Sequence, residues 1–433
     1  MEKYLNNYLT IFEKIQQSLN GNSVSELNRL RIQAFEKFKS LGFPTTKNED
    51  WKYTNVSPLL EAPFIYVGEV KAEDELTEKY RGAFSEGYFA AIVNGTFIKH
   101  DSSSDEMPEG IIFDSLSSQL EKNNTLVTDY LGKICKIENG FTALNTACIT
   151  DGVMLFIPDN TTLEKPLIIF NLSGSLSGKF LVQPRNLIIA GDNSKAEIFE
   201  VHLSLHDNEC LVNSVTEIIC GNNSDVKIYR LQNENNKTIQ INLTESRLNS
   251  SAVYSHYSFT FGGKLVRNDT NIVLKGENAT GNLYGLYIIN DTQHVDNHTL
   301  IDHSVPNCQS NELYKGILKD SSRAVFNGKV FVRKDAQKTN AYQSNKAILL
   351  SDDARIDTKP QLEIFADDVK CSHGAAIGQL DKDAMFYLRS RGIDENKAGE
   401  ILLRAFADEV IDFIQNKHIH GYLDSIINAK INS

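Results

Sequence analysis

Short β-type runs follow one another from about Tyr88 to Leu380, and this long series constrains the fold more than any other feature. Runs such as GVMLFIP, NLIIAG, SVTEIICG and VKIYRLQ are rich in β-branched and aromatic residues, and clusters of Asn, Asp, Gly and Ser separate them. That pattern is typical of strands joined by tight turns. The region has no convincing helical window, so we expect one all-β unit that is a barrel, a pair of sandwiches or a solenoid.

Recurring Gly-Asx groups favour the solenoid. The segments GDNSKA, GNNSDV and GENATG each precede a run of alternating apolar residues, as expected if brief corners link stacked coils. The repeats are unequal, however, and counting reveals no strict period. The pattern alone therefore leaves a right-handed parallel β-helix and a β-sandwich as equal alternatives.

Helical sequence precedes the β region, and we place an N-terminal helical region at residues 1–87 before a core at residues 88–380. Ser23 and Glu26 match an S-x-x-E capping box, which predicts the start of a helix. Gly42 predicts the end of the same helix.

A C-terminal helical region is expected at residues 381–433. Asp381 and Asp394 can each cap the first turn of a helix, and Gly392 can end the first of the two. The second helix carries an apolar stripe of Ala398, Ile401, Leu402, Ala405, Phe406, Val410 and Phe413. Such a stripe either packs on the β unit or forms a docking surface.

The charge balance excludes several classes of partner. With 44 basic and 56 acidic residues, the formal net charge of −12 opposes binding to nucleic-acid phosphates and to anionic membranes. The sequence has no apolar run of about 18 residues, as a membrane span requires, and its start lacks the pattern of a signal peptide. Six cysteines without a CxxC pair indicate reduced thiols. We therefore expect a cytoplasmic protein with neither nucleic-acid nor membrane partners.

The segment PQLEIFADDVKCSHGAAIGQLD, from Pro360 to Asp381, contains the clearest candidate site. Because side chains alternate across a strand, Cys371 and His373 are expected on one face, together with Asp367. Sulfur, nitrogen and oxygen donors on one strip suit metal chemistry. The alternative interpretation is a buried cysteine beside a core histidine, and we favour packing for the other five cysteines.

Three histidines in QHVDNHTLIDH form a weaker candidate. A zinc-protease motif needs Glu after the first His, but Val295 follows His294, and the surrounding sequence is strand-like. In a strand, His294 and His298 share a face and His303 falls on the other. We therefore do not expect a permanent zinc site here.

The chain lacks the sequence signatures of common enzymes. Each of its Gly-Lys pairs lacks the following Ser or Thr of a P-loop, so we do not expect it to hydrolyse ATP. Neither a GxSxG motif nor a Gly-rich dinucleotide turn is present.

Several stretches are distinctive: KNEDWKYTNVSPL (47–59), PRNLIIAGDNSKAEIFE (184–200), GGKLVRND (262–269), QHVDNHTLIDH (293–303), ELYKGILKDSSRAVFNGKVFV (312–332), the run 336–381 and FYLRSRGI (386–393). They resemble segments of the SufD-type iron-sulfur cluster assembly proteins. The resemblance implies a right-handed parallel β-helix between two helical regions. It would thus decide between the two folds that the pattern leaves open.

The same resemblance implies a function. SufD-type proteins are non-catalytic scaffold subunits that pair with the related SufB and bind the SufC ATPase, so ATP hydrolysis would belong to SufC. SufB-like sequences carry a cysteine at the position of Leu388, which follows Phe386 and Tyr387 here. This substitution indicates a SufD-type chain.

The resemblance also implies site residues. His373 matches the interface histidine of the family and is our candidate ligand for iron or proton donor at a transient Fe-S cluster shared with SufB. Cys371 is a second candidate. We expect no cofactor bound permanently to the isolated chain, and reduced flavin in the full complex is a further possibility. For SufC binding we assign Ile401, Leu402, Ala405, Phe406 and Val410.

Two other functions stay open beside this one. The isolated chain is expected to form a homodimer through the edge that would otherwise meet SufB. An exported β-helical protein that binds or cleaves carbohydrate is the alternative from another class, and it would need a groove with paired carboxylates.

Overall fold

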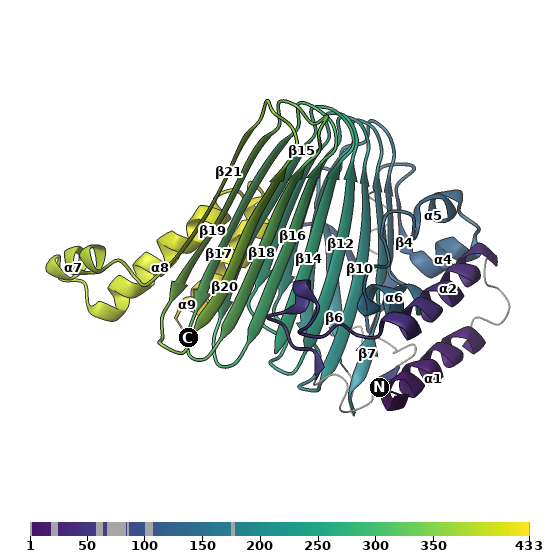
Figure 1. Cartoon of the computed structure of the whole chain (residues 1–433), viewed down its shortest axis with the longest axis horizontal. Coiled ribbons are helices and arrows are strands. Elements are labelled where there is room, and N and C mark those ends of the chain that lie inside the picture. Colours follow the sequence, from purple (N-terminus) through teal and green to yellow (C-terminus); the bar gives the residue numbers. More distant parts are fainter. Residues whose placement is uncertain are drawn as a thin grey trace.

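The computed structural model describes residues 2–18, 25–57, 64–66, 84, 86–99, 107–174 and 178–432. Its centre is a parallel β-helix of about 8 turns with helices at both ends (Figure 1). The solenoid is therefore confirmed, and the sandwich alternative is wrong. The capping residue proposed for the second helix, Ser23, lies outside the described residues.

Two parallel sheets form the walls of the β-helix, and each coil contributes one strand to each sheet. The long strands of the first sheet are β5 (Val153–Ile157), β8 (Arg185–Ala190), β10 (Cys210–Cys220), β12 (Ile239–Leu248), β14 (Leu265–Leu274), β16 (His294–His303), β18 (Arg323–Val332) and β20 (Arg355–Ile364). The second sheet contains β2 (Tyr88–Val93), β6 (Leu167–Ser173), β9 (Lys195–Ser204), β11 (Asp225–Gln232), β13 (Val253–Thr260), β15 (Thr280–Ile289), β17 (Gln309–Leu318), β19 (Asn340–Leu349) and β21 (Lys370–Gly378). The short strands β1 (Ile65–Tyr66) and β7 (Phe180–Val182) join the first sheet.

Coil length varies along the β-helix. Ile239 pairs with Leu265, so that coil takes 26 residues (239 to 265). Arg323 pairs with Arg355, and that coil takes 32 residues (323 to 355). This variation explains why counting along the sequence reveals no strict period.

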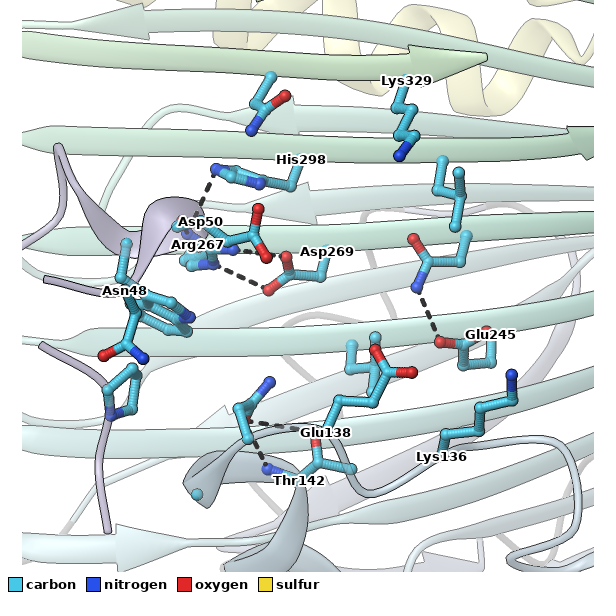
Figure 2. Close-up of a pocket in the computed structure, with 18 of the residues that line it drawn as sticks. Asn48, Asp50, Lys136, Glu138, Thr142, Glu245, Arg267, Asp269, His298 and Lys329 are labelled. Carbon is cyan, nitrogen blue, oxygen red and sulfur yellow. Dashed lines mark hydrogen bonds and ion pairs between the residues drawn. The ribbon is translucent and has the colours of Figure 1, made fainter. Parts of the chain in front are cut away.

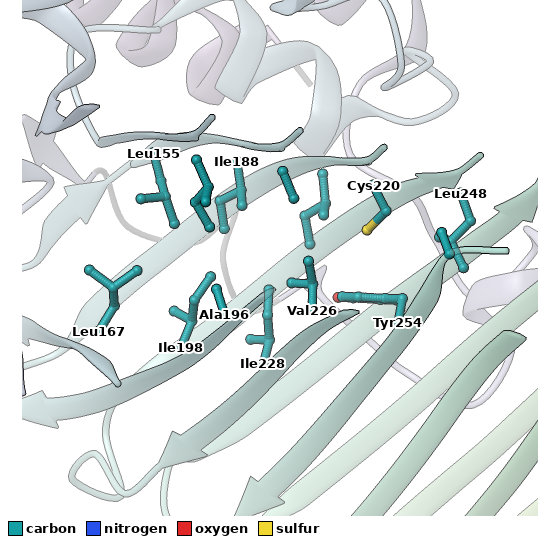
Figure 3. Close-up of a cluster of buried hydrophobic side chains, with 14 of the residues drawn as sticks. Leu155, Leu167, Ile188, Ala196, Ile198, Cys220, Val226, Ile228, Leu248 and Tyr254 are labelled. Atoms are coloured by element: carbon teal, nitrogen blue, oxygen red, sulfur yellow. The ribbon is translucent and has the colours of Figure 1, made fainter. Parts of the chain in front are cut away.

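Apolar side chains from both sheets fill the first part of the β-helix (Figure 3). Ile188 and Leu248 of the first sheet pack with Ile198 and Ile228 of the second, and each is at most 1% exposed. Because side chains alternate along a strand, every second residue enters this core. Burial of each such side chain contributes roughly 1.5–3 kcal/mol, so the stack of coils is a major source of stability.

Asparagines shape one row of corners between the sheets. Asn193, Asn223 and Asn278 have φ angles of 56°, 55° and 61°, a left-handed conformation that Asn adopts more readily than most residues. The Asn223 side-chain amide donates to Asn193 Oδ1 at 2.9 Å and so joins two coils. At Gly276 a Cβ would lie 1.9 Å from the backbone nitrogen of Ser250, so only glycine fits. The predicted Gly-Asx corners are confirmed.

Polar side chains occupy another part of the interior, and many of them are paired. Glu200 and Arg230 form an ion pair of 2.7 Å, and Arg230 also donates to Thr244 at 3.1 Å. Burial raises the pKa of Glu200, but the charge of Arg230 outweighs it and leaves that pKa well below its usual range. Burial lowers the pKa of His256 to about 3, so this histidine is neutral. Pairing of this kind offsets much of the desolvation cost of polar groups.

The N-terminal end of the β-helix is closed. The strands β3 (Thr96–Lys99) and β4 (Ile112–Ser115) pair antiparallel with β2 and β5, so both parallel sheets stop there. The helices α1 (Glu2–Ser18), α2 (Ser25–Leu41), α4 (Leu116–Glu121), α5 (Thr125–Tyr130) and α6 (Gly140–Ala147) pack on the outer face of the first sheet. Gly42, with φ 61°, follows α2 as predicted.

The helices α4, α5 and α6 correct one expectation, because we expected no helix between residues 88 and 380. Each contains only six to eight residues. Side-chain caps start them: Asn139, for example, accepts from the backbone N–H of Phe141 at 2.9 Å. Elements this short do not repeat often enough to produce a helical period in the sequence.

Three helices follow the last coil: α7 (Lys382–Ser390), α8 (Glu395–Ile411) and α9 (Lys417–Ile431). Asp381 Oδ1 accepts from the backbone N–H of Asp383 at 2.8 Å, and Asp394 Oδ1 accepts from that of Lys397 at 3.0 Å. Both predicted caps are therefore confirmed, and Gly392, with φ 86°, follows α7. We did not expect a third helix here from the sequence, so α9 is an addition to the prediction.

The helices α8 and α9 cover part of the outer face of the second sheet (Figure 1). Leu403 of α8 and Leu423 of α9 are buried in one cluster with Tyr229 and Tyr257 of the sheet. Their apolar stripes therefore serve mainly to pack on the β-helix. None of the described helices has both the length and the apolar character needed to cross a bilayer.

Candidate functional site

The last coil, formed by β20 and β21, ends both sheets, and no further strand pairs with it in the described part of the chain. No residue of these two strands is buried. Phe365 and Ile377 are 59% and 47% exposed. We call the surface formed by residues 355–378 the open end. An uncovered strand edge presents free N–H and C=O groups, so the open end offers both backbone edges and apolar side chains.

His373 lies on β21 at the open end. Its partner across the ladder is Gln343 of β19, and Cys371 is paired with Ala341. Gln343 and Ala341 are buried and face the interior, so Cys371 and His373 share the inner face of the last coil, as the alternation predicted. The prediction was wrong for Asp367, because this residue lies in a bend before β21 begins at Lys370. His373 is nevertheless exposed, because no described coil covers that face.

Cys371 differs from His373 in its surroundings. It is half-buried and packs with Val330, Val332 and Ala341. Burial raises the pKa of its thiol. Because the thiolate is the form that binds metals, Cys371 is a poorer ligand than an exposed cysteine would be.

The five other cysteines are all buried, which confirms the expectation that they serve packing. Burial raises the pKa of the Cys148 and Cys220 thiols to about 12. Across the residues that the structure describes, no group of three His, Cys, Asp or Glu side chains could hold a metal ion. Within that part of the chain, a metal bound to His373 would therefore need further ligands from a second molecule.

A second polar cluster lies on the outer face of the first sheet, where three of the distinctive stretches meet. Thr54 donates to Asp296 Oδ2 at 2.5 Å, and its Oγ1 lies 2.9 Å from His294 Nε2. Arg267 forms an ion pair with Asp296 at 2.7 Å, and its guanidinium carbon lies 3.9 Å from the centre of the Trp51 ring. We call Trp51, Thr54, Arg267, His294 and Asp296 the clamp, because they fasten the N-terminal segment to the β-helix.

Two of the three histidines make contacts at the clamp: His294 contacts Thr54, and His298 contacts Asp296. Burial raises the pKa of Asp296, but the charges of His298 and Arg267 outweigh it and hold that pKa well below its usual range. His298 Nε2 lies 3.0 Å from Asp296 Oδ1. His303 points inward instead, and its Nε2 lies 2.9 Å from Ser310 Oγ. The predicted division of the histidines between two faces of the strand is confirmed.

A groove of about 470 Å³ opens beside the clamp (Figure 2). Its charged lining mixes both signs, with Lys136 and Lys329 near Glu138, Glu245 and Asp269. Burial raises the pKa of Glu245 to about 7. The mixed signs give the groove no strong preference for an anion or a cation.

The five residues assigned to SufC binding differ in exposure. Ile401 and Ala405 are exposed on α8, whereas Leu402 and Phe406 are half-buried. The ring of Phe406 covers the ammonium group of Lys315, which lies 3.9 Å from the ring centre. Val410 is 0% exposed and belongs to the core under α8, so it supports the helix and presents no surface to a partner.

The helix α7 presents exposed aromatic residues that were not among the predicted binding residues. Phe386 and Tyr387 are 76% and 58% exposed, and α7 has no buried residue. In Figure 1 this helix stands away from the β-helix at the far end of the molecule. Large exposed aromatic side chains on a projecting helix are typical of contact surfaces. The signal was present in the FYLRSRGI stretch, but burial cannot be read from so short a helix.

The fold and the site define a solenoid protein whose candidate chemistry lies at an uncovered end. Comparison with protein families gives a more specific result. The family model of the SUF system FeS cluster assembly SufBD core domain matches residues 172–406, and that of the SufBD protein N-terminal region matches residues 2–169. The chain therefore belongs to the SufBD family of iron-sulfur cluster assembly proteins.

Curated relatives agree with this assignment. An iron-sulfur cluster assembly SufBD family protein of Synechocystis sp. is 32% identical over 96% of this chain and 94% of its own length. The iron-sulfur cluster assembly protein SufD of Escherichia coli is 28% identical over 89% of this chain and 88% of its own length. The chloroplastic protein ABCI7 of Arabidopsis thaliana is 27% identical over 95% and 88%.

Proposed function

We propose that this chain is a SufD-type scaffold subunit that pairs through its open end with a SufB-type chain and helps to build iron-sulfur clusters there. The observation that carries the proposal is the open end, where β20 and β21 each have one uncovered edge and β21 carries the exposed His373. The similarity to Escherichia coli SufD over most of both chains supports it. Membership of the SufBD family also speaks against the carbohydrate alternative.

Pairing would extend both sheets. A second chain with the same open end can add one strand to β20 and one to β21, which satisfies the free backbone groups of both edges. Phe365 and Ile377 would be buried in the same contact. The isolated chain has the same edges available for a second copy of itself, so we also propose a homodimer when the SufB-type partner is absent.

The cluster is the cargo of this complex, and His373 would contribute one ligand to it. A neutral imidazole nitrogen can bind iron, and it adds no negative charge to a ligand set that otherwise consists of thiolates. The SufB-type partner would supply thiolate sulfur. Cys371, with a pKa raised by burial, would act mainly in packing. No bound cofactor is proposed for the isolated chain, and reduced flavin in the complete complex stays a prediction.

A SufC-type ATPase would dock on α7 and the exposed face of α8. Phe386 and Tyr387 of α7 provide the largest exposed apolar area there, and Ile401 and Ala405 continue it on α8. ATP hydrolysis would belong to this partner, and the present chain would act without catalysis in the cytoplasm. Binding here would let movement of the ATPase reach the last coil through Asp381, which joins β21 to α7.

The ligand role is tested by producing the chain together with its SufB-type and SufC-type partners under anaerobic conditions. We expect His373→Ala to reduce bound iron and sulfide by at least about 10-fold while the complex stays intact. His206→Ala, which changes an exposed histidine outside the open end, should have no effect. Normal cluster content in an intact His373→Ala complex would refute the ligand role.

The docking role needs surface substitutions, because removal of α8 and α9 would uncover the core around Tyr229 and Tyr257. We expect Phe386→Asp to abolish recovery of the ATPase with the purified chain. Tyr130→Asp, a matched change at the closed end where Tyr130 is 37% exposed, should leave recovery unchanged. Equal recovery with both variants would refute docking on α7.

A further inference from the structure

Three polar side chains lie in register on three neighbouring strands of the second sheet, and the last of these strands is at the open end. Glu312 of β17 pairs in register with Gln343 of β19, and Gln343 pairs with His373 of β21. Neighbouring strands lie about 4.8 Å apart, so side chains in register stack on one another. We call Glu312, Gln343 and His373 the polar ladder. It leads from the closed interior to the candidate ligand.

The inner part of the polar ladder is held by short hydrogen bonds. Glu312 is 3% exposed, and its Oε1 accepts from Thr299 Oγ1 at 2.5 Å. Its Oε2 accepts from Gln343 Nε2 at 2.8 Å. Each carboxyl oxygen therefore has a donor. These contacts fix the nitrogen of the Gln343 amide on the side of the preceding coil.

The oxygen of the same amide has no partner. Gln343 is 3% exposed, and its Oε1 is buried without any hydrogen bond. An unpaired buried acceptor costs about 1–3 kcal/mol, so this oxygen favours any donor that can reach it. The amide group is planar and its nitrogen and oxygen point apart, so Oε1 is directed away from Glu312. The next residue of the polar ladder on that side is His373.

The backbone of β18 also lies close to the Gln343 amide. Gly328 of β18 lies against Gln343, and a Cβ at Gly328 would be 2.3 Å from Gln343 Nε2. A side chain there would displace the amide from Glu312. Glycine at this position therefore leaves room for the nitrogen of Gln343 beside Glu312.

We propose that Gln343 is a positioning residue: the exposed ring of His373 turns toward the unpaired Oε1 of Gln343 and donates its Nδ1–H to it, which leaves Nε2 of His373 free to bind iron. The inference rests on the proposed ligand role of His373. Metal-binding histidines commonly donate their second ring N–H to a protein oxygen, and this bond fixes both the tautomer and the direction of the ring. Glu312 acts one step further back, because it fixes which end of the Gln343 amide faces the histidine.

The first test reads the tautomer of His373 directly and needs no cluster. In the full chain labelled with ¹⁵N-histidine, two-bond ¹H–¹⁵N spectra distinguish the Nδ1–H form from the Nε2–H form. The chain has ten histidines, and comparison with His373→Gln identifies the signals of His373. We expect the Nδ1–H form to dominate in the wild type. In Gln343→Leu we expect a shift toward the Nε2–H form. A dominant Nε2–H form in the wild type, or an unchanged ratio in Gln343→Leu, would overturn the inference.

A control and a rescue separate this bond from a general packing effect. Asn345 is a second buried amide on the inner face of β19, and its ladder partner is Ala375 instead of His373. Asn345→Leu should therefore leave the tautomer of His373 unchanged. The double variant Glu312→Gln with Gln343→Glu keeps the hydrogen bond between positions 312 and 343, with donor and acceptor exchanged. The second carboxylate oxygen at position 343 can still accept from His373. The double variant should restore the Nδ1–H form that Gln343→Leu loses.

Cluster content then distinguishes this inference from the proposed function. In the anaerobic complex we expect Gln343→Leu to weaken retention of iron by about 10-fold, a smaller loss than that of His373→Ala. If His373→Ala has no effect while Gln343→Leu still shifts the tautomer, the ligand role fails and the hydrogen bond stands. If Gln343→Leu retains iron as well as the Asn345→Leu control does, the positioning role is refuted.

Discussion

The two ends of the β-helix differ in how well their terminal strands are buried. At the N-terminal end, β3 and β4 turn back antiparallel and helices pack over the first sheet, so β2 and β5 of the first coil are almost entirely buried. At the C-terminal end, β20 and β21 have no buried residue and no strand beyond them among those described. Protected edges prevent uncontrolled pairing. The difference indicates that stability comes from the covered end and that the open end is available for a partner.

Truncation of a core side chain should lower the free energy of unfolding more than the other substitutions do. The loss should be larger at the covered end than at the open end. Leu155 of β5 is 0% exposed, so we expect Leu155→Ala to lower the free energy of unfolding by about 2–5 kcal/mol. Leu362 of β20 is only half-buried, and Leu362→Ala should cost clearly less. Denaturant unfolding of both variants measures the contrast. Equal losses would contradict the assignment of stability to the covered end.

A charge at the open end should weaken pairing. Ile377→Lys places an ammonium group on the inner face of the last coil, where a second chain would have to bury it. We expect the dissociation constant for a second chain to rise by about 100-fold, which corresponds to about 2.7 kcal/mol. Analytical ultracentrifugation of the isolated chain and of the mixed complex measures this effect. Ile65→Lys changes a 51% exposed isoleucine of β1, away from the open end, and should pair normally. Weaker pairing in both variants would show that the open end is not the pairing surface.

A buried carboxyl in the early coils should make stability depend on pH. Burial raises the pKa of Glu234 from 4.5 to about 8. Between these values the folded chain holds a proton that the unfolded chain has lost, so this contribution to stability is full below 4.5 and disappears as the pH rises through 8. We therefore expect the stability of Glu234→Gln relative to the wild type to increase from pH 5 to pH 6.5, by about 2 kcal/mol. A constant difference over that range, measured by urea unfolding, would show that Glu234 is not buried in this way.

Loss of one hydrogen bond of the clamp should have the smallest effect on stability. Thr54→Val removes the hydroxyl that donates to Asp296, while the ion pair of Asp296 with Arg267 remains. We expect a loss of about 1 kcal/mol and faster proteolysis of the segment around Trp51. Thr10→Val, at an exposed threonine of α1, serves as the control. If protease sensitivity of that segment does not change, the clamp does not hold it.

Much of the fold follows from local patterns in the sequence. The Gly-Asx corners around Asn193 and Asn223, and the caps at Asp381 and Asp394, depend on residues next to each other in the chain, and they were predicted. The helices α4, α5 and α6 were not, because six to eight residues carry too little periodicity. The choice of a solenoid over a sandwich required the family resemblance, since coil length varies too much for a visible repeat.

The sequence predicted only part of the candidate site. Alternation placed Cys371 and His373 on one face, but it could not show that their coil is the last one and that His373 is therefore exposed. The link between His373 and Gln343 depends on strand register across thirty residues, from 343 to 373, which no local pattern encodes. Exposure of Phe386 and burial of Val410 depend likewise on how the helices pack.

Hydrogen exchange at the two ends of the β-helix can show whether a partner covers the open end. The backbone amides of β20 and β21 that point away from β18 and β19 should exchange fast in a monomeric form, such as dilute Ile377→Lys, and should become protected when the wild-type chain binds a SufB-type partner. Amides of β3 and β4 should not change on binding. Protection that appears at both open strands and is absent at the closed end is the predicted result. A stable complex in which β20 and β21 exchange as fast as in the monomer would contradict the account.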